Sequence, residues 1–391
     1  MIRLTFVFLF CVAALSASGQ SIASLNQNYL YDPNEEVQAL LHAQHEDGKM
    51  RVDYRFAFKP IDNLQQVYQV IWETRESYTQ RVGTEFRRDS LTIGAGSKPV
   101  AGYVAVEVQE KPYLLVVIIR NQKTGRQWTF HHLIEKIFPV RGRLESESGT
   151  WMSSYVSVGE TYRVVGSGSN QPLFVSFYRN KKFPPALPPF AEKLPPAERF
   201  LFHDSVFRVN SGGTIRFNSP GLYLFQEDTA AADGFSIMAV TPPFPKYNRV
   251  EQIRDPLMYV CTPDEYKSLE AAGSDKAMFD KVILEITRDK DRARNFMRSY
   301  FRRVELANTY FTSYKEGWRS DRGMIYLVFG PPDELLFNAG NQVWRYRALD
   351  VSFTFVKSGS VYDPDHFILL RDKRFSEAWY STIDLWRKAR F

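Results

Sequence analysis

Histidine is the side chain best suited to moving protons or binding metal near neutral pH. The chain has six of them: His42, His45, His131, His132, His203 and His366. His42 and His45 are three residues apart and would share one face of the short helical stretch expected there. No histidine or glutamate follows at the spacing of a zinc site, so we interpret them as a surface pair. His131 and His132 are neighbours on an expected strand and must point to opposite faces, which excludes a shared metal ion.

Other local patterns give no complete catalytic set. Residues 363–366 place two carboxylates and an imidazole in one turn, but no oxygen-rich loop of calcium-binding length surrounds them. The glycine-rich residues 166–170 lack the lysine and the following helix of a phosphate-binding loop. Carboxylate pairs for glycoside hydrolysis come from distant strands and leave no local signature, so a hydrolase remains open. We therefore predict no catalytic residue, no cofactor and no metal.

The most specific motif is Gly-Trp-Arg-Ser-Asp-Arg-Gly at residues 317–323. It joins a helical stripe to the apolar run at residues 324–329, which we predict to be a strand ended by Gly330. Gly317 is expected to end the helix in a left-handed conformation, and Gly323 to admit close backbone approach. Trp318 is expected to fill the space between helix and sheet, with its indole N–H bonded to a partner.

The polar residues of this motif permit two interpretations. Ser320 or Asp321 can accept backbone N–H bonds within the turn, and Arg322 can bridge Asp321 or Asp333. In one interpretation, Trp318, Asp321, Arg322 and Asp333, with Ser320 beside them, form a recognition site for a partner or ligand. In the other, which we favour, they only lock the corner.

Residues 280–391 resemble the GWxTD domain, a bacterial cell-envelope family named for its pentapeptide. The resemblance is carried by Gly317-Trp318-Arg319-Ser320-Asp321, Arg302-Arg303-Val304, Ala307-Asn308, Gly330-Pro331-Pro332-Asp333 and Trp344-Arg345-Tyr346. Ser320 stands where the family's threonine is expected, which keeps the hydroxyl. The resemblance implies an exported envelope protein with β-sandwich domains ahead of this module. It implies no established catalytic activity, so no catalytic residue is carried over.

The elements before the motif are predicted to be mostly strands. Residues 51–58 alternate polar and apolar side chains, and residues 114–119 form a continuous apolar run typical of a central strand. Turn signals recur every eight to twelve residues, roughly the spacing of an immunoglobulin-like β-sandwich. We assign residues 20–140 to this first sandwich.

A second sandwich-like domain is predicted at residues 150–247. Tyr223 follows the corner at residues 218–221 and is expected to bond back to the turn backbone, a structural role. The proline-rich residues 184–189 must be extended and cannot pair inside a sheet. A stiff surface connection is the favoured interpretation, and a docking strip for an aromatic groove is the alternative.

Residues 248–391 form the third predicted domain, an α+β module. Apolar residues recur at spacings of three and four between residues 279 and 311, which predicts two helices with a break near residues 288–291. Strands are predicted at residues 343–346, 351–356 and 367–370. The fold class is therefore mixed β and α+β, with two immunoglobulin-like β-sandwich regions followed by helices and a small antiparallel sheet.

The first nineteen residues have the order of a secretory signal peptide: Arg3, an apolar run at residues 4–15, and small residues to Gly19. We place the cleavage after Gly19. The run of about twelve apolar residues is shorter than the roughly 20 that span a bilayer, and no later run is longer, so the mature chain is expected to have no transmembrane span. It keeps one cysteine, Cys261, and can form no internal disulfide.

The formal net charge of +6 is small for 391 residues, and basic and acidic residues interleave, which disfavours nucleic acid as a partner. We predict an exported protein, periplasmic or outer-membrane-associated, that acts as an interaction or scaffold protein. Its expected partners are other envelope proteins, bound through the β domains and the GWxTD module. The alternatives are a glycan-binding protein, suggested by the 15% aromatic content, or a hydrolase with its site between the second β domain and the C-terminal module.

Overall fold

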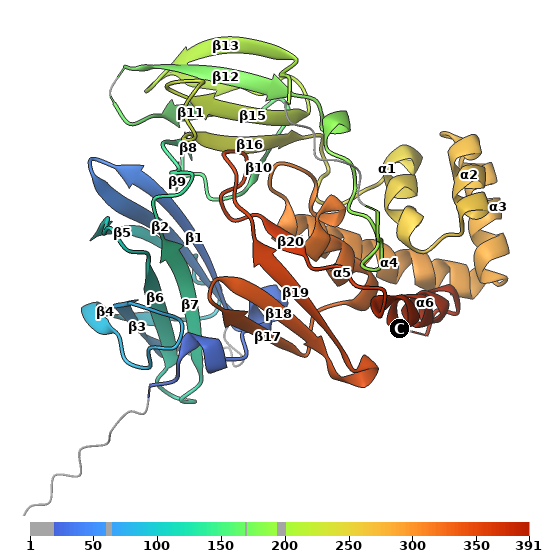
Figure 1. Ribbon diagram of the computed structural model, residues 1–391, viewed down its shortest axis with the longest axis horizontal. Coiled ribbons are helices and arrows are strands. Elements are labelled where there is room, and N and C mark those ends of the chain that lie inside the picture. The colour runs from blue at the N-terminus through green and yellow to red at the C-terminus, as the bar shows by residue number, and fades with distance from the viewer. Residues whose placement is uncertain (1–18, 60–64, 169, 194–200, 391) are drawn as a thin grey trace, which may run out of the picture.

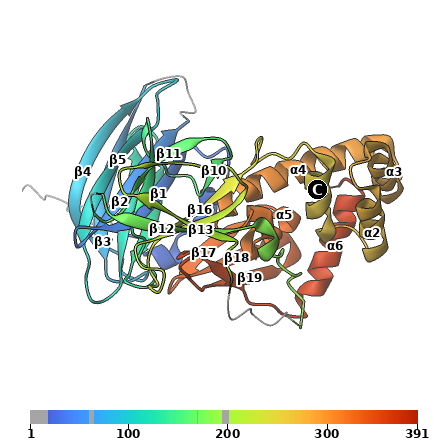
Figure 2. The same ribbon diagram turned by 90° about the horizontal axis from the view of Figure 1, so that it is seen from above.

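The computed structural model describes residues 19–59, 65–168, 170–193 and 201–390. Two β-rich bodies lie beside a body of helices and one small sheet, which confirms the predicted fold class (Figures 1 and 2). The signal peptide predicted at residues 1–19 lies, apart from Gly19, outside the described residues. Within those residues, every helix is too short or too polar to cross a membrane.

The first sandwich packs a sheet of order β1-β2-β5 against a sheet of order β4-β3-β6-β7. Its core joins Val52 and Phe56 of one sheet to Trp72 and Val117 of the other. The strands are β1 (Val37–Glu46), β2 (Lys49–Phe58), β3 (Gln66–Arg75), β4 (Thr84–Ile93), β5 (Val100–Glu107), β6 (Tyr113–Asn121) and β7 (Gln127–Ile134).

The helical stretch predicted around His42 and His45 is wrong. Both residues lie on strand β1, which pairs antiparallel with β2 along its whole length, His42 opposite Asp53. Alanine, leucine and glutamine in this segment favour a helix locally, but ten consecutive cross-strand pairs outweigh that weak preference.

The second sandwich packs a sheet of order β10-β16-β15-β12-β13 against one of order β14-β11-β8-β9. Strand β10 runs parallel to β16, and the other paired strands are antiparallel. The strands are β8 (Arg143–Ser146), β9 (Gly149–Thr150), β10 (Tyr155–Ser157), β11 (Thr161–Val165), β12 (Pro172–Tyr178), β13 (Ser205–Asn210), β14 (Thr214–Arg216), β15 (Gly221–Gln226) and β16 (Phe235–Val240).

Tyr223 forms the corner predicted for it, because its hydroxyl donates to the carbonyl oxygen of Ser219 at 3.0 Å. Replacing Tyr223 with phenylalanine should lower the free energy of unfolding by about 1 kcal/mol, the net value of one hydrogen bond. Chemical denaturation measures this change. An unchanged unfolding midpoint would show that the corner adds nothing to stability.

The C-terminal module combines helices with a sheet of order β17-β18-β19-β20. Its elements are α1 (Val250–Arg254), α2 (Pro263–Ala272), α3 (Lys276–Thr287), α4 (Lys290–Phe311), α5 (Asp321–Phe329), β17 (Glu334–Asn338), β18 (Asn341–Tyr346), β19 (Val351–Lys357), β20 (Phe367–Leu369) and α6 (Phe375–Arg387). Short 3-10 segments are η1 (Ile22–Ser24), η2 (Asn28–Tyr31), η3 (Asn180–Lys182), η4 (Asp255–Tyr259), η5 (Gly317–Arg319) and η6 (Arg347–Leu349). The predicted break between two helices is confirmed: Arg288 is left-handed, and Asp289 accepts a hydrogen bond from the Arg292 backbone N–H at the start of α4.

The strand predicted at residues 324–329 is wrong, because these residues belong to helix α5. Residues 324–328 are all buried, so the helix is apolar on every side and shows no periodicity that separates it from a buried strand. The signals that do mark a helix lie at its ends. Ser320 accepts the Gly323 N–H at the start, and Gly330, at φ 86°, ends it.

Candidate functional site

The motif at residues 317–323 forms a tight corner between α4 and α5. Asn308 of α4 accepts the backbone N–H of Trp318 at 3.2 Å, and the Thr312 hydroxyl accepts that of Gly317 at 3.0 Å. The Ser320 hydroxyl donates to the Gly317 carbonyl at 2.7 Å and accepts from the Gly323 N–H at 3.0 Å. The hydroxyl that serine shares with threonine is therefore the group this position needs.

Both glycines of the corner are required by close packing. A Cβ atom on Gly317 would lie 2.0 Å from the Ala307 carbonyl oxygen, and one on Gly323 would lie 1.8 Å from the Gly317 carbonyl oxygen. The prediction for Gly323 is confirmed. The left-handed helix end predicted at Gly317 is wrong, since α4 ends at Phe311 and Gly317 opens a new 3-10 segment.

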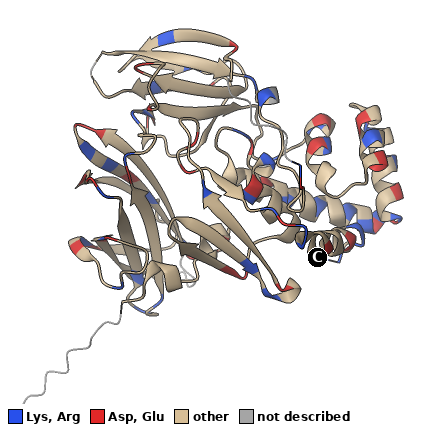
Figure 3. Cartoon of the chain, in the orientation of Figure 1, with Lys and Arg blue, Asp and Glu red and all other residues tan. Residues whose placement is uncertain are grey.

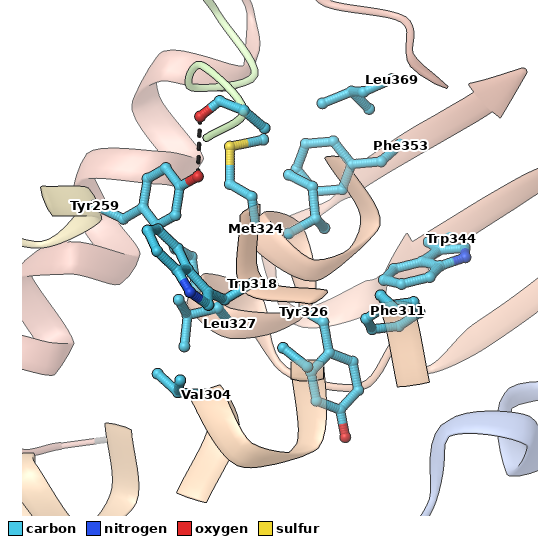
Figure 4. Packing of buried hydrophobic residues seen from close by; sticks show 14 of the residues in the cluster. Tyr259, Val304, Phe311, Trp318, Met324, Tyr326, Leu327, Trp344, Phe353 and Leu369 are labelled. Carbon is cyan, nitrogen blue, oxygen red and sulfur yellow. Dashed lines mark hydrogen bonds between the residues drawn. The ribbon is translucent and has the colours of Figure 1, made fainter. Parts of the chain in front are cut away.

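Trp318 is 1% exposed and lies within the hydrophobic core of the module. Its indole N–H donates to the Tyr247 hydroxyl at 3.0 Å, and its ring meets that of Tyr259 edge-on at 6.0 Å. Figure 4 shows Trp318 between Tyr259 and Leu327, on the side of α5 away from Trp344. The expected polar partner of the indole is present, and Trp318 presents no surface to solvent.

Asp321 forms a buried ion pair that joins α5 to the segment after β20. One carboxylate oxygen accepts from Arg371 Nη2 at 2.6 Å, and the other accepts the Leu369 backbone N–H at 2.9 Å. The side chains of Asp321 and Arg371 are each 11% exposed. Asp321 thus bonds across the module, whereas Ser320 caps the local turn.

The predicted bridge from Arg322 to Asp321 or Asp333 is wrong. The Arg322 guanidinium lies over the rings of Phe367 and Phe311, at 4.4 and 5.5 Å from their centroids. Asp321 is already paired with Arg371, so the aromatic faces are the better partners for this cation.

Asp333 is exposed and bonds to neighbours other than the corner residues. Its backbone carbonyl accepts from the side-chain amides of Asn26 and Asn28, and its carboxylate accepts the Arg347 N–H at 2.7 Å. The four residues of the hypothetical recognition site therefore do not form one exposed surface: Trp318 and Asp321 point inward, Arg322 packs on rings, and Asp333 fastens the N-terminal segment.

A proline-rich segment covers the corner. Figure 1 shows it in green, running from the second sandwich to the helices of the C-terminal module. We call residues 183–190 the strap. Its backbone is held by the module at six points: Phe183, Pro184, Ala186, Leu187 and Pro189 offer carbonyl oxygens, and Ala186 also donates its N–H to Arg319. The docking interpretation of the prolines thus applies within the chain itself.

A cavity of about 610 Å³ lies where the three modules meet. All three modules supply its walls. The first sandwich contributes strands β1 and β7, and the second contributes residues 151–155 and β16. The C-terminal module contributes the end of α4 and residues 361–365. Cavities at the boundaries of domains are common places for ligands.

Lys357 pairs in this cavity with one carboxylate that follows β7 and with one carboxylate of its own module. Lys357 Nζ lies 2.7 Å from Glu135 and 3.0 Å from Asp365. Burial favours the neutral form of Asp365, but a protonated His132 and the Lys357 ammonium outweigh it and lower the pKa of Asp365 to about 2. Burial likewise opposes the charge on Lys357, yet the two carboxylates raise its pKa. Asp365 is therefore held as an anion and is poorly suited to donate a proton near neutral pH.

Several histidines lie at the cavity or in the core, whereas His203 is exposed. His42 and His132 line the cavity, and burial lowers the pKa of both. His131 points to the other face of β7, as predicted, and meets the Phe337 ring edge-on at 4.4 Å. Burial lowers the pKa of His131 to about 3. All three imidazoles are neutral near pH 7, and His, Cys, Asp and Glu form no metal-binding group in the described residues.

Acid should destabilise the fold below pH 6.5. A histidine with a lowered folded pKa contributes its full stability above the unfolded value of about 6.5, and this is lost as the pH falls toward the folded pKa. For His131 the loss between pH 6.5 and 5 is about 2 kcal/mol. The free energy of unfolding, measured at pH 6.5 and at pH 5, should fall less in His131→Phe than in the unmodified chain. The exposed His203→Phe serves as control, and equal losses in both variants would contradict the assignment.

Tryptophan exposure bears on the glycan alternative. All seven tryptophans lie in the described residues; Trp72, Trp128, Trp318, Trp344, Trp386 and Trp379 are buried, and Trp151 is partly buried. Trp151 donates its indole N–H to the Tyr155 carbonyl at 2.9 Å and lines the cavity. An exposed row of tryptophans for stacking sugars is thus absent from the described residues, and Trp151 is the tryptophan that lines the cavity.

Sequence reasoning missed Tyr259 and Arg371. Both donate hydrogen bonds to the strap, and Arg371 also pairs with Asp321. Arg371 is fifty residues from Asp321, so no local spacing signals their pairing. The proline run was the available signal, because its carbonyl oxygens cannot pair within a sheet and need hydrogen-bond donors from another part of the chain.

Comparison with known proteins supports one assignment. Residues 221–388 match the model of the GWxTD domain family, starting at strand β15, well before the motif. No curated protein matches the chain. Among solved structures, it is similar to a calcium-binding mutant of Bacteroides uniformis beta-glucuronidase 2 (12% identity, 31% of this chain, 16% of that one, TM-score 0.20). It is also similar to red sea bream transglutaminase (11% identity, 53% of this chain, 32% of that one, TM-score 0.20). The chain spans less than a third of either protein, and these likenesses carry no argument about function.

Proposed function

We propose that this chain, which carries a GWxTD domain at residues 221–388, is an exported cell-envelope protein that binds other envelope proteins and performs no chemical step. The β-sandwiches and the GWxTD module would act together as a scaffold in the periplasm or at the outer membrane. Cleavage of a signal peptide after Gly19 is part of this proposal.

The observation that carries the proposal is the tight union of the three modules. Tyr31, from the segment before the first sandwich, is buried against the rings of Phe311 and Trp344 in the C-terminal module. Its carbonyl accepts from the Tyr326 hydroxyl at 3.1 Å. Large apolar contacts between domains restrict their relative motion. A chain joined in this way presents one continuous surface, which favours a binding role.

The second sandwich is fastened to the C-terminal module by polar contacts. The Ser236 hydroxyl donates to the Tyr362 carbonyl at 2.6 Å, and the hydroxyls of Tyr362 and Tyr178 are 3.3 Å apart. Figure 3 shows basic and acidic residues interleaved over the elements, most clearly along α2 and α3. That distribution suits protein partners better than a polyanion.

Fractionation and crosslinking of cells that produce the full chain test the proposal. The expected result is a mature chain that starts at Gln20, is found in the envelope fraction, and crosslinks to other envelope proteins. Tyr31→Ala should loosen the module junction and reduce the crosslinked yield. Tyr103→Ala, which removes a 55% exposed tyrosine of the first sandwich, is the control. A chain that keeps its N-terminus in the cytoplasm would contradict the proposal.

The cavity supports a second candidate, the binding of an uncharged polar ligand such as a glycan. His42 and His132 offer neutral imidazoles to it, and Trp151 and Tyr155 offer aromatic faces. The hydrolase alternative gains less, because Asp365 stays ionised beside Lys357. Calorimetry with neutral oligosaccharides tests this candidate: binding should be lost in His132→Ala and kept in His203→Ala. Absence of binding to the unmodified chain would remove it.

A further inference from the structure

The C-terminal module binds the strap mainly through the carbonyl oxygens of the strap backbone. Prolines cannot donate hydrogen bonds and fix an extended course, so their segment offers carbonyl oxygens in a preformed arrangement. The Tyr259 hydroxyl donates to the Ala186 carbonyl at 2.9 Å, and Arg371 Nη2 donates to that of Leu187 at 3.0 Å. The dashed line in Figure 4 marks the bond of Tyr259.

The donors come from separate elements of the module. Lys315 and Arg319 reach the carbonyls of Pro184 and Phe183, and the Asp372 N–H donates to Pro189 at 3.0 Å. Together with Tyr259 and Arg371, they form what we call the strap surface: Tyr259, Lys315, Arg319, Arg371 and Asp372. Tyr259 lies in η4, Arg319 in η5 and Lys315 just before η5, and Arg371 and Asp372 follow β20.

Aromatic rings close the two ends of this arrangement. The Phe183 ring meets the Tyr314 ring edge-on, with 5.2 Å between their centroids. The Phe190 ring centroid lies 5.3 Å from that of Tyr380 and 6.2 Å from that of Trp379. Proline-rich segments dock into grooves lined by aromatic side chains, and here hydrogen-bond donors to the strap carbonyls lie between such side chains.

The strap does not use every donor of the surface. Arg371 Nε is buried and has no hydrogen-bond partner among the described residues. The bonds from Lys315 and Arg319 are long, at 3.3 and 3.4 Å. A buried guanidinium N–H without an acceptor is costly, so a segment that offered one more oxygen would fit better.

We propose that the strap surface is a binding site for an extended, uncharged, proline-containing segment of a partner protein, and that the strap is the occupant supplied by the chain itself. This inference rests on the proposed function, since it states the chemistry of a partner for the GWxTD module. The partner segment displaces the strap and takes over its backbone hydrogen bonds.

A labelled synthetic peptide with the sequence of residues 183–191, which carries no charged side chain, is the probe. It is titrated into the full mature chain and into a variant whose residues 184–190 are replaced by a Gly/Ser segment of equal length. The variant should bind at least about 10-fold more tightly, because in the unmodified chain the strap competes at a millimolar effective concentration. A peptide with every proline changed to glycine should bind more weakly, as it loses the preformed course.

Substitutions in the Gly/Ser variant locate the bound peptide. Tyr259→Phe removes a donor to the strap and should weaken binding several-fold. Tyr300→Phe is a matched control, since this buried hydroxyl donates to the Pro256 carbonyl at 2.7 Å, away from the strap. Equal effects of the two substitutions would contradict the assigned surface.

If the Gly/Ser variant does not fold, Ala186→Pro takes its place, because it removes the strap N–H donated to the Arg319 carbonyl and adds a ring at a buried position, which loosens the strap without replacing it. The proposal is overturned if neither variant binds the peptide more tightly than the unmodified chain. Since purified protein is used, that failure is distinct from failure of the export and crosslinking experiment.

Discussion

Replacing Trp318 with alanine should lower the free energy of unfolding by about 3–5 kcal/mol, the usual cost of removing a large buried side chain. Trp318 is 1% exposed, fills the space beside Tyr259, and satisfies the hydroxyl of Tyr247. The alanine variant leaves a cavity and removes that hydrogen bond. Chemical denaturation, followed by a signal from the C-terminal module, measures the loss.

Met278→Ala is the control for this prediction, because Met278 lies in the same module and is 49% exposed. Its effect on stability should stay within about 0.5 kcal/mol. A Trp318→Ala protein that unfolds like the unmodified chain but captures no partner would contradict the structural role and make Trp318 a recognition residue.

Replacing Asp321 with alanine should also cost about 3–5 kcal/mol, because it leaves the buried Arg371 cation without its partner. The Leu369 backbone N–H loses its acceptor as well. The free energy of unfolding of Asp321→Ala, Arg371→Ala and the double variant measures the coupling. The double variant should lose much less than the sum of the two single losses.

Asp384→Ala is the matched control on α6, where the carboxylate pairs with Lys388 on the surface. Exposed pairs of this kind contribute about 0.5 kcal/mol or less. Additive losses for Asp321 and Arg371, or a loss no larger than that of Asp384→Ala, would show that the buried pair does not hold the module together.

The sequence predicts the parts of this fold that depend on local patterns. Alternation identified β2, and the spacing of three and four identified α3 and α4 with their break at Arg288. The prediction of secondary structure was wrong where the local sequence pattern conflicts with the tertiary fold. The apolar run of α5 has no period because every side is buried, and β1 has helix-favouring residues that cross-strand pairing overrides.

At the candidate site, the sequence identified the residue types but not their partners. The motif predicted a locked corner with an indole bonded to a partner, a hydroxyl that caps a turn, and a glycine under close approach. The pairing of Asp321 with Arg371 and the stacking of Arg322 on Phe367 depend on residues about fifty positions away, which a single sequence does not connect. The same holds for the strap and its donors.

Hydrogen exchange of the unmodified full-length chain tests most directly whether the strap is a separable occupant of a permanently folded corner. The two amides to compare are Ala186, which donates to Arg319, and Met324, which donates to Ser320 at 2.8 Å. We predict that Ala186 exchanges at least about 100-fold faster than Met324 after correction for intrinsic rates, through local opening of the strap. Equal protection of the two amides would contradict this, because the strap would then open only when the whole module unfolds.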